Sequence, residues 1–147
     1  MMAELKVRVN ATGEEKIDNV IIAMQEDQLI KKLKDKSGII LAANVPGAEE
    51  SKAICYSGEG DVIMFIIEKT PAGSQTNDAE FTAYAKYQNI MLRLMKLLFG
   101  DEEGSDSLIC GTNITAPTSV KTEWEYNIYG GYNGLSVSFK LKDNAGL

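Results

Sequence analysis

The chain contains no histidine among its 147 residues, and this absence removes the most common tools of catalysis. Histidine is the usual general base near neutral pH, the partner in Ser-His and Cys-His nucleophile pairs and the most frequent metal ligand. The glycine-rich patterns GxxxxGK[ST] and GxGxxG and the spacing of zinc ligands are also missing. The acidic loop at residues 101–106 does not match the EF-hand pattern. We therefore expect no catalytic, cofactor-binding or metal-ligating residues, and we expect that the protein is not an enzyme.

Long apolar runs and an excess of basic residues are missing as well. The net charge is −6, so the chain lacks the general electrostatic footprint of a nucleic-acid-binding protein. The longest apolar run, VIMFII at 62–67, is far shorter than the roughly 18 residues of a membrane span. The first residues, MMAELKVRV, do not follow the pattern of a secretion signal. We expect a cytoplasmic start, no membrane and no direct nucleic acid binding.

Cysteine is scarce, and its context indicates buried thiols. Cys55 and Cys110 lack CxxC spacing and have apolar neighbours, which predicts reduced, buried side chains. The length indicates one domain, residues 1–147, with enough chain to bury a sizeable core.

The first half of the chain alternates between strand-like and helix-like patterns. Leu5, Val7 and Val9 alternate with charged residues, which predicts a strand at 4–9. Thr12 and Glu15 have capping-box spacing, so we expect a helical region from 13 to about 36, either one bent helix or two short elements. Strands are predicted at 39–45, 53–57 and 61–68. The last of these carries the run VIMFII without alternation, which indicates a central strand covered on both faces.

The second half is dominated by one long helix and a hairpin. The helix is predicted over 78–99, with Asn77 as its N-cap and Gly100 as its C-terminal stop. A short strand is expected at 108–115, followed by strands at 120–129 and 135–142. The fold class is therefore α+β, with a mostly antiparallel sheet, two helical regions and a C-terminal β-hairpin.

The stretch EYNIYGGYNGLSVSFKL at 125–141 carries the hairpin. Asn133-Gly134 matches a type I′ turn, and this register pairs Ile128 with Phe139 and Glu125 with Lys142. We expect the core-facing side chains to be Trp124, Tyr126, Ile128, Val137 and Phe139.

The YGGY segment of the hairpin is not explained by the strand pattern. Gly130 and Gly131 cost backbone entropy just before the predicted turn, and they suggest a bulge or a close backbone approach. Tyr129 falls on the polar face and Tyr132 lies at the predicted tip. Because exposed tyrosines on a rigid hairpin are good anchors, Tyr129, Gly130, Gly131 and Tyr132 are candidate interface residues.

The long helix has two apolar faces instead of one. The first face consists of Ala83, Tyr87, Ile90, Leu94 and Leu97, and the second consists of Tyr84, Met91, Met95 and Leu98. Either the helix lies deep in its own domain, or one face packs on the sheet and the other on a partner subunit. We favour the partner, because a small domain has difficulty covering both faces. Tyr87, Ile90, Leu94 and Leu97 are therefore candidate interface residues.

Two function classes fit these observations. One is a non-enzymatic structural subunit of a larger assembly, and the other is a small monomeric module that binds a ligand or protein near Tyr129 and Tyr132. The segment YNIYGGYNGLSVSFKL at 126–141 resembles the ends of small uncharacterised virion proteins of tailed bacteriophages, of the head-tail connector or tail type. The resemblance implies a neck or tail component that forms a homo-oligomeric ring beside other virion proteins, after assembly in the host cytoplasm. It covers about the last 25 residues and assigns no functional residue.

Overall fold

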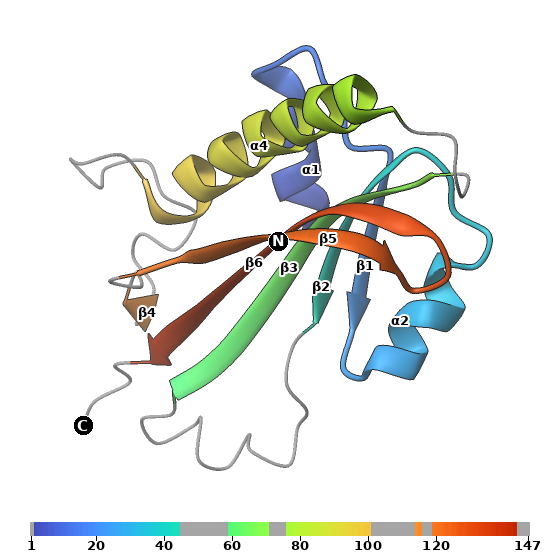
Figure 1. Ribbon diagram of the computed structural model, residues 1–147. Helices are drawn as coiled ribbons and strands as arrows, with labels where there is room; N and C mark the ends of the chain where they lie inside the picture. The colour runs from blue at the N-terminus through green and yellow to red at the C-terminus, as the bar shows by residue number, and fades with distance from the viewer. Residues whose placement is uncertain (1, 45–58, 71–75, 101–113, 116–118, 144–147) are drawn as a thin grey trace.

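The computed structural model describes residues 2–44, 59–70, 76–100, 114–115 and 119–143. Within these ranges it contains three helices and six strands in one sheet, and the α+β class with a C-terminal hairpin is confirmed (Figure 1). In chain order the elements are α1 (Met2–Ala11), β1 (Asn19–Ala23), α2 (Glu26–Leu33), β2 (Ile39–Asn44), β3 (Glu59–Lys69), α4 (Asn77–Phe99), β4 (Ile114–Thr115), β5 (Lys121–Ile128) and β6 (Tyr132–Asp143).

The sheet is built around β6, the last of these strands in sequence. The strand order is β1-β2-β3-β6-β4, and β5 also pairs with β6. Only β1 and β2 run parallel, joined by α2, while every other described pair is antiparallel. β3 pairs with β6 from Glu59↔Lys142 to Lys69↔Tyr132. On its other side, β6 pairs with β5 over its first part and with β4 at its end.

Helices cover both faces of the sheet, and this arrangement explains the apolar run of β3. α1 and α4 lie on one face, whereas α2 lies on the other (Figure 1). Met64 and Ile66 pack in the cluster beneath α1 and α4, while Phe65 and Ile67 pack in the cluster with α2. The prediction of a central strand covered on both faces is therefore confirmed.

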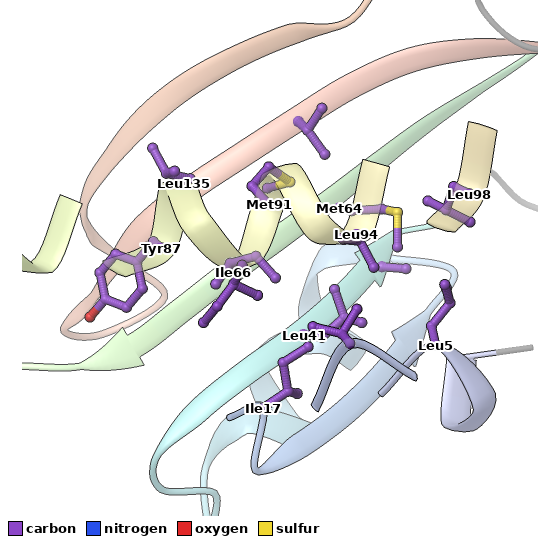
Figure 2. Close-up of a cluster of buried hydrophobic side chains, with 14 of the residues drawn as sticks. Leu5, Ile17, Leu41, Met64, Ile66, Tyr87, Met91, Leu94, Leu98 and Leu135 are labelled. Carbon is purple, nitrogen blue, oxygen red and sulfur yellow. The ribbon is translucent and has the colours of Figure 1, made fainter. Parts of the chain in front are cut away.

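The larger cluster holds α4 on the sheet. Its buried members come from α1, α4, the strands β2, β3 and β6, and the segment before β1. Ten of them are labelled in Figure 2: Leu5, Ile17, Leu41, Met64, Ile66, Tyr87, Met91, Leu94, Leu98 and Leu135. Arg93 adds a polar connection, because its guanidinium donates to the backbone oxygens of Val9 (2.7 Å) and Glu15 (3.0 Å). These contacts fix the helix relative to the N-terminal region.

The first element is a helix, so the predicted strand at 4–9 is wrong. Met2, Leu5 and Val9 are buried, and their spacing of three and four residues places them on one helical face. Val7, which alternation would also bury, is exposed. Leu5 and Val9 fit both periods, and packing against α4 decides in favour of the helix.

The predicted helical region at 13–36 is only partly correct. α2 occupies its second half, but β1 replaces its first half and pairs in parallel with β2. The run Val20-Ile21-Ile22 consists of β-branched residues, which favour a strand. Thr12 does not begin a helix, because its hydroxyl donates to the Val9 carbonyl (3.0 Å) at the end of α1.

The remaining element predictions agree better with the structure. The strands at 39–45 and 61–68 correspond to β2 and β3. α4 ends as predicted, since Gly100 has φ 80° and donates to the Lys96 carbonyl (2.8 Å). Its N-cap is Thr76 instead of Asn77, with the Thr76 hydroxyl accepting from the Ala79 amide (3.2 Å). The predicted strand at 53–57, Cys55, Cys110 and the acidic loop at 101–106 lie outside the described residues, as does 108–113 of the predicted strand at 108–115.

Candidate functional site

The hairpin turn lies three residues earlier than predicted. Ile128 pairs with Tyr132, and the Gly131 amide donates to the Ile128 carbonyl (3.2 Å) across the turn. Gly130 and Gly131 supply φ values of 82° and 114°, which glycine adopts readily. The predicted turn at Asn133-Gly134 and its register are therefore wrong, because Glu125 faces Gly134 inside the strand pair. A β-carbon on Gly134 would lie 1.9 Å from the Ile66 carbonyl oxygen, so this glycine permits close strand packing.

A β-bulge just before the turn changes which face the β5 side chains occupy. Tyr126 and Asn127 together oppose Asn133, and the Asn127 amide donates to the Asn133 side-chain oxygen (2.6 Å). Trp124 consequently packs on the α4 side, while Ile128 packs on the α2 side. Tyr126 is 65% exposed, so the prediction of one shared core face for these three residues is wrong.

The predicted core positions on β6 agree with the structure. Val137 and Phe139 are buried in the cluster beneath α4, as expected. Alternation was a reliable guide on this strand because no bulge interrupts its side-chain pattern.

Tyr132 belongs to the core and not to an exposed tip. It is 2% exposed, and its hydroxyl donates to the backbone oxygens of Leu33 (2.8 Å) and Lys36 (3.3 Å) at the end of α2. Burial raises the pKa of Tyr132. The prediction that this tyrosine is an exposed anchor is wrong, because the shifted turn draws it into the strand.

Tyr129 remains at the turn but is half-buried. Its ring packs edge-on against Phe65 with 5.6 Å between the ring centroids. Burial is the main cause of its raised pKa, with Glu26 and Glu125 adding to the effect. A contact role for Tyr129, Gly130 and Gly131 stays a prediction. Gly130 is exposed, whereas Tyr129 and Gly131 are half-buried.

The predicted interface face of α4 is covered by the chain itself. Tyr87, Ile90 and Leu94 are buried against the sheet and α1, and the half-buried Leu97 packs on the same cluster. Figure 2 shows Tyr87 and Leu94 within this cluster. The alternative of a helix sunk in its own domain is correct for this face. From the predicted second face, Met91 and Leu98 are buried in the same cluster and Met95 packs against it, whereas Tyr84 is exposed.

A different stripe of α4 is uncharged and, except at Gln88, exposed. We define the outer face of α4 as Phe81, Tyr84, Ala85, Gln88 and Leu92, which recur at helical spacing and include no charged residue. Phe81 is 74% exposed and Leu92 is 61% exposed. The sequence prediction missed Phe81 and Leu92, although the spacing of 81, 85, 88 and 92 was available to find them.

Aromatic contacts connect this outer face to β5. The ring of Trp124 lies 5.6 Å from that of Tyr84 and 6.2 Å from that of Tyr87, measured between centroids. Val120, just before β5, and Tyr126, within β5, are exposed. Exposed apolar groups therefore extend from the outer face of α4 to β5.

A groove lined by both polar and apolar groups lies between the end of β3 and the start of α4. It has a volume of about 420 Å³ and is lined by Glu68, Asp78, Ala79, Thr82, Ala83, Lys86 and Tyr87. One Glu68 oxygen accepts from the Lys86 ammonium (2.6 Å) and from the Tyr87 hydroxyl (2.8 Å). Burial and the neighbouring Glu68 raise the pKa of Tyr87, which keeps the phenol neutral. The groove therefore offers binding contacts, and its tyrosine is poorly suited to act as a base.

The described residues also bear on metal binding and on membrane insertion. Those residues contain no group of three or more acidic, cysteine or histidine side chains placed to hold a metal ion. No helix among them is sufficiently long and apolar to cross a membrane.

Comparisons with protein-family models, curated proteins and solved structures give no match to this chain. Its function is therefore argued from its surfaces.

Proposed function

We propose that the protein is a non-enzymatic structural subunit of a larger protein assembly, and that it contacts its neighbours through the outer face of α4. The observation that carries this proposal is the exposure of Phe81 and Leu92, which lie eleven positions apart on one uncharged face of the same helix. Contiguous exposed apolar surface marks protein interaction sites. The aromatic contacts to Trp124 extend this surface to β5.

The more specific proposal is a neck or tail component of a tailed-phage virion. It is supported by the resemblance of residues 126–141 to the ends of small phage virion proteins. The subunit then forms a homo-oligomer beside other virion proteins, and it is assembled in the host cytoplasm.

In particles purified from a host that carries the gene, mass spectrometry should detect its peptides. Their absence from the particles would contradict a virion role.

The assembly face is tested with the double variant Phe81→Lys/Leu92→Lys. Both side chains are largely exposed, so the melting temperature should stay close to that of the parent. Self-association in sedimentation velocity should weaken at least about tenfold, because lysine charges replace apolar contacts. Asn89→Lys is the matched control, since Asn89 is exposed on the same helix outside this face. A double variant that assembles like the parent would rule out the outer face of α4.

A second candidate function is a monomeric module that binds a ligand or protein. The groove beside Glu68 favours it, because a few polar groups, including Glu68 and Lys86, converge there on a partly apolar lining, and such groups can orient a ligand. A ligand for this groove should raise the melting temperature of the parent and not that of Glu68→Gln. Equal shifts in both proteins would place the ligand elsewhere.

A further inference from the structure

We propose that β5 pairs antiparallel with β5 of a second copy, about a twofold axis through Thr122, so that the two sheets become continuous. This inference rests on the proposed function, because it specifies how copies of the subunit meet. The contact is a strand edge, distinct from the outer face of α4 but connected to it through Trp124 and Tyr84.

The outermost strands β1 and β5 differ in whether side chains bond to their backbone groups. In β1, the Lys32 ammonium donates to the Ile22 carbonyl (2.6 Å), and just before β1 the Lys6 ammonium donates to the Asp18 carbonyl (2.6 Å). Lysines at an edge oppose further strand pairing. At β5, Lys121, Thr122 and Glu123 are exposed. Among the described hydrogen bonds, none joins a side chain to the backbone of residues 121–126.

The pairing of β6 with β3 determines which β5 residues turn their backbone N–H and C=O groups to the outer edge. The Thr70 amide donates to the Gly131 carbonyl (2.9 Å), so alternate β6 residues, 133, 135 and 137, bond to β3. Residues 134, 136 and 138 therefore bond to β5, where they face Glu125, Glu123 and Lys121. Thr122 and Trp124 consequently direct their backbone N–H and C=O groups to the outer edge.

Charge selects one register among the twofold pairings. An axis through Thr122 places Lys121 opposite Glu123 of the second copy, twice by symmetry. An axis through Glu123 would form two Lys121–Glu125 pairs but would also place Glu123 against its own copy. An axis through Lys121 would place this lysine against its own copy. An axis through Trp124 would place Glu123 opposite Glu125. The Thr122 axis forms two attractive pairs with no contact between like charges. Opposite charges across strands stabilise the pair, and like charges destabilise it.

The same register also matches the apolar side of the strand. Val120 falls opposite Trp124 of the second copy, on the α4 side of the sheet. Val120 is exposed in the single chain and becomes covered in the pair. Lys121 and Glu123, which form an ion pair of 2.8 Å within one chain, exchange partners across the axis. Both copies of α4 lie on the same face of the joined sheet.

A charge exchange tests the pairing in solution. Lys121→Glu and Glu123→Lys should each raise the dissociation constant of the dimer about tenfold or more, because each replaces two attractive pairs with two repulsive ones. The double variant Lys121→Glu/Glu123→Lys should restore the parent value. Sedimentation velocity measures the dissociation constants, and circular dichroism checks that each variant is folded. Single variants that associate like the parent, or a double variant that fails to recover, would overturn the pairing.

Cysteine substitution tests the register. Residues 122 of the two copies form a hydrogen-bonded pair with about 5.5 Å between Cα atoms, which a disulfide can span. Thr122→Cys should therefore give a covalent dimer under mild oxidation with diamide, in a Cys55→Ser/Cys110→Ser background. Glu123→Cys should not, because its two copies are diagonal across the axis. A dimer formed by Glu123→Cys alone would overturn the Thr122 axis.

The experiments distinguish failure of the proposed function from failure of the β5 pairing. If the parent associates and only Phe81→Lys/Leu92→Lys disrupts it, the edge pairing is wrong and the assembly role stands. If the parent stays monomeric at all concentrations and is absent from particles, both are wrong. A monomeric parent that is found in particles overturns the edge pairing alone.

Discussion

At the scale of single residues, the hairpin contains a glycine that is required for strand packing although its sequence context is that of a turn. Asn133-Gly134 has the composition of a turn, yet Gly134 lies within β6, where its missing side chain allows close approach to Ile66. Gly130, by contrast, lies in the turn itself, where a β-carbon would meet nothing within 4 Å. Replacing these two glycines by alanine should therefore reduce stability by different amounts.

Gly134→Ala should destabilise the protein by about 3 kcal/mol, because the added methyl group overlaps the Ile66 carbonyl and the backbone must shift. Gly130→Ala is the control. It costs only about 1–2 kcal/mol, for a φ of 82°. Urea unfolding monitored by circular dichroism measures both free energies. Equal losses in the two variants would show that Gly134 is not sterically required.

Tyr132→Phe should lower the free energy of unfolding by about 1 kcal/mol, because the carbonyls of Leu33 and Lys36 lose the hydrogen bond from the buried hydroxyl, while the Lys36 amide still donates to Leu33. The double variant Tyr129→Ala/Tyr132→Ala should melt well below the parent, since one of its two rings fills the core. Tyr126→Phe is the control, as this exposed ring has no comparable role, and its thermal midpoint should match the parent. A Tyr132→Phe midpoint equal to that of the parent would show that the hydroxyl contributes nothing.

At the scale of elements, α4 separates into a core face and an outer face that one pair of variants can distinguish. Leu94→Asp places a charge at a fully buried position, and the cost of several kcal/mol is comparable to the stability of a whole domain. Leu92→Asp introduces the same side chain two positions earlier, where leucine is 61% exposed. We expect Leu94→Asp to unfold the chain and Leu92→Asp to leave the circular dichroism spectrum unchanged. A folded Leu94→Asp variant would show that this side of the helix is not a core face.

The elements also show how far the sequence determines the fold. β2, β3 and α4 could be predicted because their patterns are long or strongly apolar, and the packing agrees with the local pattern. α1 and β1 could not, because patterns of five to ten residues fit two periods and their partners decide between them. The core face of α4 looked like an interface because the sequence does not show that α1 packs beside it.

The sequence predicted which kinds of feature the candidate site has, but not which residues form it. An apolar face on α4 and a special role for the YGGY segment were both expected. The exposed residues are Phe81 and Leu92 instead of Ile90 and Leu94, since the direction of the sheet sets which face is covered. The bulge at Tyr126 and Asn127 depends on the Asn133 side chain, which no local pattern reveals.

At the scale of the whole molecule, burial of tyrosines predicts a loss of stability in alkaline solution. Tyr87, Tyr129 and Tyr132 all have a pKa above the value of 10.0 for an unperturbed tyrosine. Below pH 10 all three are neutral in both states, so their contribution is fully present. Above pH 10 the unfolded chain ionises first, and each tyrosine that stays neutral when folded lowers stability by about 1.4 kcal/mol per pH unit.

Urea midpoints between pH 8 and pH 11 test this expectation. The parent should lose stability steeply above pH 10, and Tyr132→Phe should lose it less steeply because one ionisable group is gone. Identical slopes would indicate that Tyr132 ionises equally easily in both states.

The position of β6 has a consequence for how the protein is made. This strand contacts β3 along eleven residue pairs and also joins β5 and β4 to the sheet, yet it is the last described strand to be synthesised. Until it leaves the ribosome, β3 and α4 lack the partner that covers much of their apolar surface. The sheet therefore completes only after nearly all of the described chain has been translated, and shortened products that end before β6 should become substrates for chaperones and proteases.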